Sequence, residues 1–199
     1  MIRAAKYMKR FSRTERTLHW VNAVCFFFLL ATGLTLYLPS LAVAVGRRPL
    51  IKDMHFWGGI SWVSLLVLVV LLGDRRGLLR TARELERLDT GRLNVGQKVN
   101  AILMASFTVL FFVSGILLWL GERDTRFRFA STVVLHDGLM FVALALLVGH
   151  LYLALIHPAT RHSLRGMTLG EVREDWARVH YPQWVSDTES GADTHWSSS

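Results

Sequence analysis

Long apolar blocks alternate with short charged segments along this chain. Four blocks contain no Asp, Glu, Lys or Arg, and they are 30, 20, 23 and 23 residues long: residues 17–46, 54–73, 99–121 and 138–160. Because an α-helix rises about 1.5 Å per residue, about 20 apolar residues cross the roughly 30 Å hydrocarbon core of a bilayer. The pattern therefore predicts four transmembrane helices, at about residues 17–38, 53–73, 98–121 and 130–157.

The first block also has features of a secretory signal peptide, since basic residues precede it and Ala42-Val43-Ala44 lies near its end. A signal h-region contains only about 7–15 apolar residues, however, and this block is twice as long. We expect a helix that is retained.

The composition excludes a water-soluble globule, with 52% hydrophobic residues and a mean hydropathy of +0.33. Of the 23 Lys and Arg residues, 17 lie before the first predicted helix, between the second and third, or after the fourth, and 6 lie in the other two connections. The positive-inside rule places the more basic side in the cytoplasm. We predict an all-α integral membrane protein, a four-transmembrane-helix bundle with both termini cytoplasmic.

Three segments follow from this topology: a cytoplasmic N-terminal segment (1–16), the membrane domain (17–160) and a cytoplasmic C-terminal tail (161–199). The net charge of +8 is then a signal of topology and of lipid contact. The basic residues flank the spans and form no DNA-binding motif, so we expect no nucleic-acid partner. The single cysteine, Cys25, excludes an internal disulfide or iron–sulfur cluster, and we assign it no function.

The parts outside the spans are short. Residues 75–98 form a basic connection in which the spacing of four leucines, Leu78, Leu79, Leu85 and Leu88, predicts a surface helix. Residues 167–178, with Met167, Val172 and Trp176 among charges, predict a second short helix. Residues 186–199 are rich in Ser, Asp and Thr, a composition that is disordered when nothing orders it.

Four histidines lie within the predicted spans at matched depths. His55 and His136 each begin a span at the outer surface, and His19 begins a span at the cytoplasmic surface. His150 follows His136 by 14 residues, which advances about 21 Å along one helix face. Depth therefore pairs His55 with His136 and His19 with His150.

Two imidazoles from different helices at one level are the ligand set of a six-coordinate haem, which transfers electrons because no axial position is open. An intramembrane histidine can instead satisfy a helix–helix hydrogen bond, although ionisable residues within membranes are rare and usually functional. Each pair supplies too few ligands for a zinc or copper site. We predict a di-haem membrane domain in which His55 and His136 bind the iron of an outer haem b, and His19 and His150 that of an inner haem b.

Glycines beside these positions can give a haem room between helices. Gly33 follows His19 by 14 residues and lies on the same face at the outer level, and Gly58, Gly59, Gly138 and Gly149 adjoin predicted ligands. The alternative is ordinary packing of helices through small residues.

The order His19, His55, His136 and His150 resembles that of the di-haem cytochrome b subunits of bacterial respiratory enzymes. The closest likeness is to the gamma subunits of membrane-bound formate dehydrogenases. Asn94-Val95-Gly96-Gln97-Lys98 is similar to their NxGQK element. The tail resembles their ending in two places, Leu164-Arg165-Gly166-Met167 and Trp176-Ala177-Arg178-Val179-His180-Tyr181-Pro182. The likeness covers residues 10–184.

The resemblance implies a membrane-anchoring subunit in respiratory electron transport, in the bacterial cytoplasmic (inner) membrane. In that family a molybdenum or tungsten alpha subunit oxidises formate and a ferredoxin-like iron–sulfur beta subunit passes electrons to the outer haem. The inner haem then reduces a quinone, menaquinone or ubiquinone. The resemblance implies no formate-oxidising site in this chain, and it leaves open a higher oligomer of the heterotrimer.

The resemblance also implies a quinone site at Asn94, Gly96 and His150, because an amide side chain and a glycine N–H can donate to a quinone carbonyl. The alternative for residues 94–96 is a turn that caps the third helix. The chain departs from the family at His157-Pro158. Arg16, His157 and Arg161 are candidate contacts for haem propionates, and His157 can instead cap the helix before Pro158.

Two other functions share the histidine pattern. One is a stand-alone di-haem cytochrome b that exchanges electrons between quinone and a donor such as superoxide. The other is the cytochrome anchor of a different dehydrogenase, such as hydrogenase or thiosulfate reductase. The long basic connection and the Trp176–Trp184 segment favour a subunit that docks onto partners.

Overall fold

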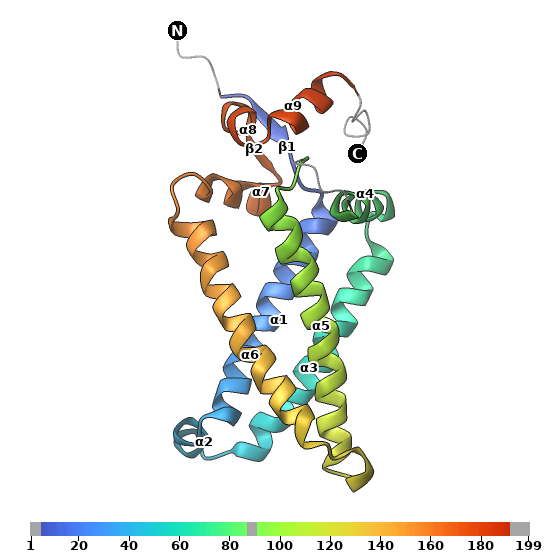
Figure 1. Cartoon of the computed structure of the whole chain (residues 1–199), viewed down its shortest axis with the longest axis vertical. Coiled ribbons are helices and arrows are strands. Elements are labelled where there is room, and N and C mark those ends of the chain that lie inside the picture. The colour runs from blue at the N-terminus through green and yellow to red at the C-terminus, as the bar shows by residue number, and fades with distance from the viewer. Residues whose placement is uncertain (1–4, 87–90, 192–199) are drawn as a thin grey trace. The chain divides into compact units, whose positions relative to one another are not determined.

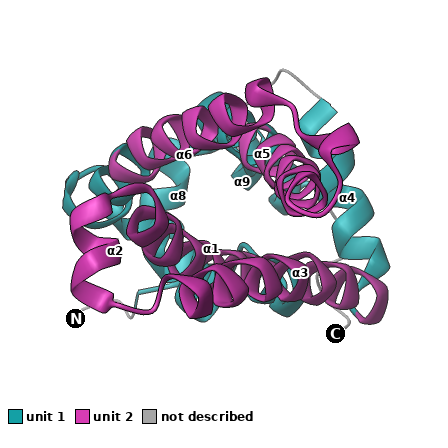
Figure 2. Ribbon diagram, turned by 90° about the horizontal axis from the view of Figure 1, so that it is seen from below, with its two compact units in different colours: residues 1–17, 73–102, 149–199 teal, residues 18–72, 103–148 magenta. Residues whose placement is uncertain are grey.

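The computed structural model describes residues 5–86 and 91–191 (Figure 1). The chain divides into two compact units (Figure 2): unit 1 comprises residues 1–17, 73–102 and 149–199, and unit 2 comprises residues 18–72 and 103–148. The elements, in chain order, are β1 (Tyr7–Lys9), α1 (Arg13–Tyr37), α2 (Pro39–Val45), α3 (Arg48–Leu72), α4 (Arg75–Glu86), α5 (Val95–Gly121), the 3-10 turn η1 (Thr125–Phe127), α6 (Ala130–Leu151), the π-helical turn η2 (Tyr152–Ile156), the 3-10 turn η3 (Arg161–Ser163), α7 (Leu164–Leu169), β2 (Glu171–Arg173), α8 (Glu174–His180) and α9 (Pro182–Glu189).

The predicted fold class is confirmed. Within the described residues, four helices are long and apolar enough to cross a membrane: α1, α3, α5, and α6 continued through η2. Large apolar side chains remain exposed along them, for example Val24 and Val134, as expected where lipid is the solvent. The cytoplasmic location of the termini stays a prediction.

The helices begin before the apolar blocks that predict them, α1 at Arg13 and α5 at Val95. The reason is local capping. The backbone N–H of Ser12 donates to Glu15 Oε2 at 2.7 Å, and the N–H of Glu15 donates back to Ser12 Oγ at 3.2 Å. Such a capping box satisfies backbone donors that the first helical turn leaves unpaired. Hydropathy marks only the part of each helix that lies in hydrocarbon, and so it misses these polar first turns.

In unit 2, α1 packs closely against α3. Trp62 of α3 is buried and donates from Nε1 to Asn22 Oδ1 of α1 at 3.1 Å. A Cβ at Gly58 of α3 would lie 2.6 Å from a ring carbon of Phe28 on α1, so the helix contact depends on a glycine there. Figure 2 shows α1 and α3 along one side of this unit, with α5 and α6 along the other. Small residues thus let the backbones approach, as in other membrane helix pairs.

In unit 1, a short antiparallel pair of strands joins two distant parts of the sequence. Tyr7 of β1 pairs with Arg173 of β2, and Lys9 pairs with Glu171. The single helix predicted over residues 167–178 is therefore wrong. Gly170 has φ +87°, a left-handed conformation that ends α7, and β2 separates α7 from α8. Glycine adopts that conformation without the strain of a Cβ, which explains the break.

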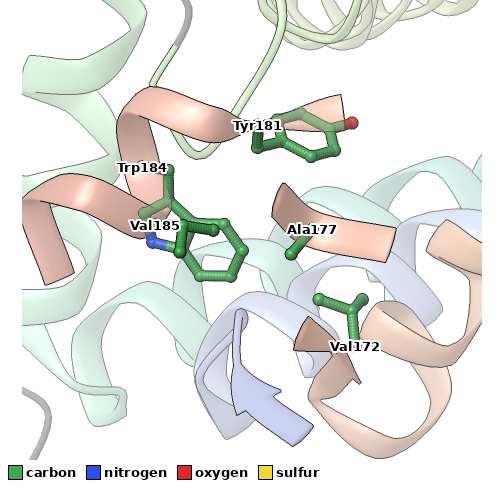
Figure 3. Close-up of a cluster of buried hydrophobic side chains, with 5 residues drawn as sticks. All are labelled: Val172, Ala177, Tyr181, Trp184 and Val185. Atoms are coloured by element: carbon green, nitrogen blue, oxygen red, sulfur yellow. The ribbon is translucent and has the colours of Figure 1, made fainter. Parts of the chain in front are cut away.

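A compact apolar cluster forms the core of the C-terminal part of unit 1, and Figure 3 shows its five buried members: Val172, Ala177, Tyr181, Trp184 and Val185. The fully buried guanidinium of Arg10 lies over the ring of Tyr181, 4.1 Å from its centroid, and donates to the carbonyl oxygen of Arg92 at 2.8 Å. A desolvated cation over an aromatic face is attracted by the ring quadrupole. Burial lowers the pKa of Arg10 below its ordinary value.

The predicted surface helix of the basic connection is confirmed as α4, although Leu88 lies outside the described residues. The buried Arg92 guanidinium holds this region together by pairing with Glu15 at 2.8 Å and with Glu84 at 3.1 Å. Burial by itself would lower the pKa of Arg92, but the two carboxylates raise it above its ordinary value. The predicted disorder of residues 186–199 does not hold for the helical end of α9, and residues 192–199 lie outside the described part.

Candidate functional site

The two histidines predicted at the outer surface come together in unit 2. The ring of His55, on α3, lies 6.1 Å from the ring of His136, on α6, between centroids, and the ring planes are 75° apart. The side chain of Phe111, on α5, packs edge-on against His136 at 5.2 Å. Two neighbouring imidazoles from two separate membrane helices are thus held inside one unit.

Each of these rings is held by a hydroxyl from a further helix. His55 Nδ1 lies 2.8 Å from Thr32 Oγ1 of α1, and His136 Nδ1 lies 2.8 Å from Ser114 Oγ of α5. Sequence reasoning missed Thr32 and Ser114. The available signal was a hydroxyl residue followed by glycine, at residues 32–33 and at residues 114–115, inside two blocks without charged residues.

A cavity of about 590 Å³ contains both imidazoles and lies wholly within unit 2. This volume is in the range of about 300–1,000 Å³ that is usual for cofactor and ligand sites. Most of the lining is apolar or aromatic, and charged side chains also contribute, among them Lys52 paired with Glu122 at 2.6 Å. Such a lining suits a flat apolar molecule that carries a few polar substituents.

Glycines leave space beside the imidazoles. A Cβ at Gly33 would lie 3.3 Å from His55 Cε1, and a Cβ at Gly115 would lie 3.7 Å from His136 Cε1. Gly59 also lines the cavity, and a Cβ there would meet nothing within 4 Å. Gly58, in contrast, packs against Phe28. The clearance interpretation therefore fits Gly33 and Gly59, and the packing interpretation fits Gly58.

The ligand set fits a haem better than a bare metal ion. An imidazole nitrogen binds a metal at about 2.0–2.1 Å, so an ion sandwiched between two rings separates their centroids by about 6 Å. The observed 6.1 Å matches this spacing. Among the described residues, no group of three or more His, Cys, Asp or Glu side chains could hold a metal. Two protein ligands suffice only where a macrocycle supplies the other four.

The second predicted pair lies in different units. His19 belongs to unit 2, is half-buried and packs edge-on against Trp20 at 5.3 Å. His150 belongs to unit 1, in the last turn of α6. The pairing of His19 with His150 stays a prediction.

Asn94 caps α5, as the alternative interpretation of residues 94–96 predicts. Its Oδ1 accepts the backbone N–H of Gln97 at 2.9 Å, and its own N–H donates to Gln97 Oε1 at 3.2 Å. Gln97 Oε1 also accepts from Arg10 at 3.2 Å and from the Tyr181 hydroxyl at 3.3 Å. The NxGQK element therefore has a structural role in unit 1. The quinone role of Asn94 and Gly96 stays a prediction.

The three candidate propionate contacts lie at or next to helix ends in unit 1. Arg16 donates to the carbonyl oxygens of Met167 and Thr168, at the end of α7. His157 donates its backbone N–H to Tyr152 O at 3.0 Å and so closes η2 before Pro158, as the capping interpretation predicts. Arg161 lines a pocket of about 330 Å³ together with His162, Arg165 and Arg173. The propionate roles stay predictions.

Comparison with known proteins gives one family and several relatives. The family described as prokaryotic cytochrome b561 matches residues 10–170. The cytochrome b556(fdo) subunit of formate dehydrogenase from Escherichia coli K12 is 28% identical over 89% of this chain and 92% of the relative. The cytochrome b556(Fdn) subunit of the nitrate-inducible formate dehydrogenase from the same strain is 24% identical, over 93% of each chain. The formate dehydrogenase cytochrome b556 subunit of Haemophilus influenzae is 25% identical over 86% of this chain and 79% of the relative.

Proposed function

The chain belongs to the prokaryotic cytochrome b561 family, whose cofactor is haem b, and we propose that His55 and His136 are the axial ligands of one such haem. The observation that carries this proposal is the 6.1 Å separation of the two imidazoles inside an apolar cavity of about 590 Å³. A haem with two imidazole ligands has no open axial position and supplies one-electron transfer. The chain's own residues orient the imidazoles and exclude water from the space around them.

A second haem b is assigned to His19 and His150. The support is the depth of the two residues in their helices, with His150 about 21 Å along α6 from His136 on one helix face. Two haems at the two surfaces would provide a path for electrons across the bilayer. No covalent haem attachment is involved, because the one cysteine lies within α1 and outside any Cys-x-x-Cys-His motif.

The relatives suggest the complex in which these haems work. All three are named as cytochrome b subunits of formate dehydrogenases, and they match nearly the whole chain. We therefore assign this chain as the membrane-anchoring electron-transfer subunit of a formate dehydrogenase. Its donor is an iron–sulfur beta subunit, and formate is oxidised in a molybdenum or tungsten alpha subunit. The single Cys agrees with this division, since a [4Fe–4S] cluster needs four thiolates.

The acceptor is assigned as quinone, reduced beside the inner haem. Asn94, Gly96 and His150 are the candidate contacts, and the excess of Lys and Arg on that side supports its assignment to the cytoplasm. Quinone reduction takes up two protons, which cytoplasmic water can supply there. Electron flow toward this side would then move charge across the bacterial inner membrane, and one elementary charge crossing 100 mV corresponds to about 2.3 kcal/mol.

Purification of the native complex from membranes tests the assignment. We expect iron–sulfur and molybdenum or tungsten subunits to copurify with this chain. The chain itself should contain two low-spin haems b with separate reduction potentials. A fully loaded sample with one haem would refute the di-haem assignment. A chain that purifies alone and oxidises superoxide with quinone as acceptor would refute the assignment to a formate dehydrogenase.

A further inference from the structure

We propose that Thr32 and Ser114 are positioning residues that select the metal-binding tautomer of His55 and His136. The proposal rests on the assignment of these histidines as haem ligands and adds a role for two hydroxyls outside the ligand set. All four residues lie in unit 2, so the contacts belong to one compact body.

Each hydroxyl contacts a backbone carbonyl of its own helix. Thr32 Oγ1 lies 3.0 Å from the carbonyl oxygen of Phe28, one turn earlier in α1, and Ser114 Oγ lies 2.6 Å from that of Leu110, one turn earlier in α5. A carbonyl oxygen can only accept, and a hydroxyl has one hydrogen to donate. In this arrangement the hydrogen of each hydroxyl is directed at a carbonyl of its own helix, and a lone pair of the hydroxyl oxygen remains available to a donor on another helix.

Each hydroxyl also contacts an imidazole nitrogen. Each hydroxyl oxygen lies 2.8 Å from a ring Nδ1, and with the hydroxyl hydrogen directed at the carbonyl, the proposed arrangement has this nitrogen carry the ring hydrogen and donate it. A neutral imidazole has one N–H, and Nε2 is then the nitrogen with a free lone pair. That lone pair is the one a metal requires. The two hydroxyls thus leave Nε2 of both rings as the nitrogen that can bind a metal.

Burial makes this selection strong. Thr32 is 7% exposed and Ser114 is 2% exposed, so little water competes for either hydroxyl. The other tautomer would require each hydroxyl to turn its hydrogen away from the helix carbonyl and toward Nδ1, and Nε2 would then carry the ring hydrogen and have no lone pair for a metal.

The arrangement occurs twice with one local design. On α1 the hydroxyl residue Thr32 precedes Gly33, and on α5 Ser114 precedes Gly115. The hydroxyl contacts Nδ1, and the glycine that follows it leaves room beside Cε1 of the same ring. A Cβ on that glycine would lie 3.3 Å from Cε1 of His55 and 3.7 Å from Cε1 of His136. Each ligand helix, α3 or α6, is therefore served by a hydroxyl–glycine pair on another helix. This recurrence favours a shared role over two unrelated packing contacts.

The hydrogen bond should also tune the reduction potential. An acceptor at the second ring nitrogen raises the basicity of a metal-binding histidine. A more basic ligand stabilises the oxidised, more positively charged iron, so Thr32 and Ser114 lower the potential of the outer haem. Loss of either bond should raise it.

The test uses the full-length chain in its haem-loaded form, with Thr32→Val and Ser114→Ala. Redox titration should show that the reduction potential of one haem rises. The rise should change the oxidised-to-reduced ratio at a fixed applied potential by up to about tenfold, which is about 59 mV for one electron. Electron paramagnetic resonance should show altered g-values for the same haem. Thr35→Val and Thr108→Val are matched controls, because these hydroxyls also donate to carbonyls in their own helices, at 2.8 Å to Ala31 and 2.9 Å to Met104. They should leave both haems unchanged.

Thr32→Ser separates this role from plain packing, since it restores the hydroxyl without the methyl group. If Thr32→Val weakens haem retention, Thr32→Ser should restore retention and the original potential. The proposal is overturned if Thr32→Val and Ser114→Ala keep the wild-type potentials and g-values, or if Thr32→Ser is as altered as Thr32→Val. The ligand assignment would survive either result and fails separately, if His55→Ala retains two bis-imidazole haems.

Discussion

The imidazole of His55 and the imidazole of His136 lie 6.1 Å apart although their helices, α3 and α6, are separated in sequence by the whole of α4 and α5. As ligands of one iron, they should be equally necessary. His55→Ala and His136→Ala should each lower the haem-to-protein ratio from two to one and remove the same spectral component. His180→Ala, on the exposed face of α8, is a matched histidine control and should retain both haems.

The inner pair makes the complementary prediction. His19→Ala and His150→Ala should remove the other component and leave that of His55 and His136 intact. Reduction potentials measured on each variant would identify which haem remains. Loss of the same haem from His19→Ala and His55→Ala would show that pairing by depth is wrong.

Two substitutions at Asn94 distinguish capping from quinone binding. Asn94→Asp keeps the side-chain oxygen that accepts the Gln97 N–H, so stability should be retained, but it replaces the amide donor by a carboxylate. Asn94→Ala removes the cap as well and should cost about 0.5–2 kcal/mol of stability. If the amide donates to quinone, Asn94→Asp should slow quinone reduction while the donor still reduces both haems. Normal quinone turnover by Asn94→Asp would leave Asn94 with the capping role alone.

The glycines beside the two outer ligands should differ in their tolerance of a methyl group. In Gly33→Ala the new Cβ would lie 3.3 Å from His55 Cε1, and the ring cannot retreat without lengthening its bond to Thr32. We expect a cost of about 1–3 kcal/mol from overpacking, seen as weaker haem retention. In Gly115→Ala the corresponding distance is 3.7 Å, an ordinary contact. Equal haem retention by the two variants would contradict this ranking.

Arg92→Leu should destabilise unit 1 without changing either haem spectrum. It removes the cationic partner of Glu15 and Glu84, whose side chains are 8% and 14% exposed. Removing one partner of a buried ion pair costs about 3–5 kcal/mol. Thermal unfolding and limited proteolysis of the tail should detect the loss. Arg173→Leu is the control, because its ion pair with Asp175 is exposed, and it should have little effect.

The spans and the outer histidine pair could be predicted from the sequence because both depend on properties that single residues report. Hydropathy identifies the segments that lie in hydrocarbon, and helical rise converts the positions of His55 and His136 into depths. The same reasoning placed the first residues of α1 and α5 too late in the sequence. The N-terminal starts of these helices are set by capping hydrogen bonds of Ser12 and Asn94, which a hydropathy pattern does not show.

What the sequence concealed depends on contacts between distant segments. Val172 and Trp176 fit the apolar spacing of one helix, but Gly170 adopts a left-handed conformation and β2 pairs with β1 instead. Thr32 and Ser114 read as isolated polar residues within spans, and only the packing of α1 on α3 and of α5 on α6 brings them to the imidazoles.

The pairing of β1 with β2 constrains the order of assembly during synthesis. Tyr7 precedes all four spans in the sequence and its partner Arg173 follows them, so all four spans are translated before this ladder can form. At about 5–20 residues per second, the first strand waits roughly ten to thirty seconds for the second. Through that interval the backbone of β1 does not yet have β2 as its partner, and Arg10 does not yet have the ring of Tyr181. Closure of unit 1 therefore waits until all four spans have been made.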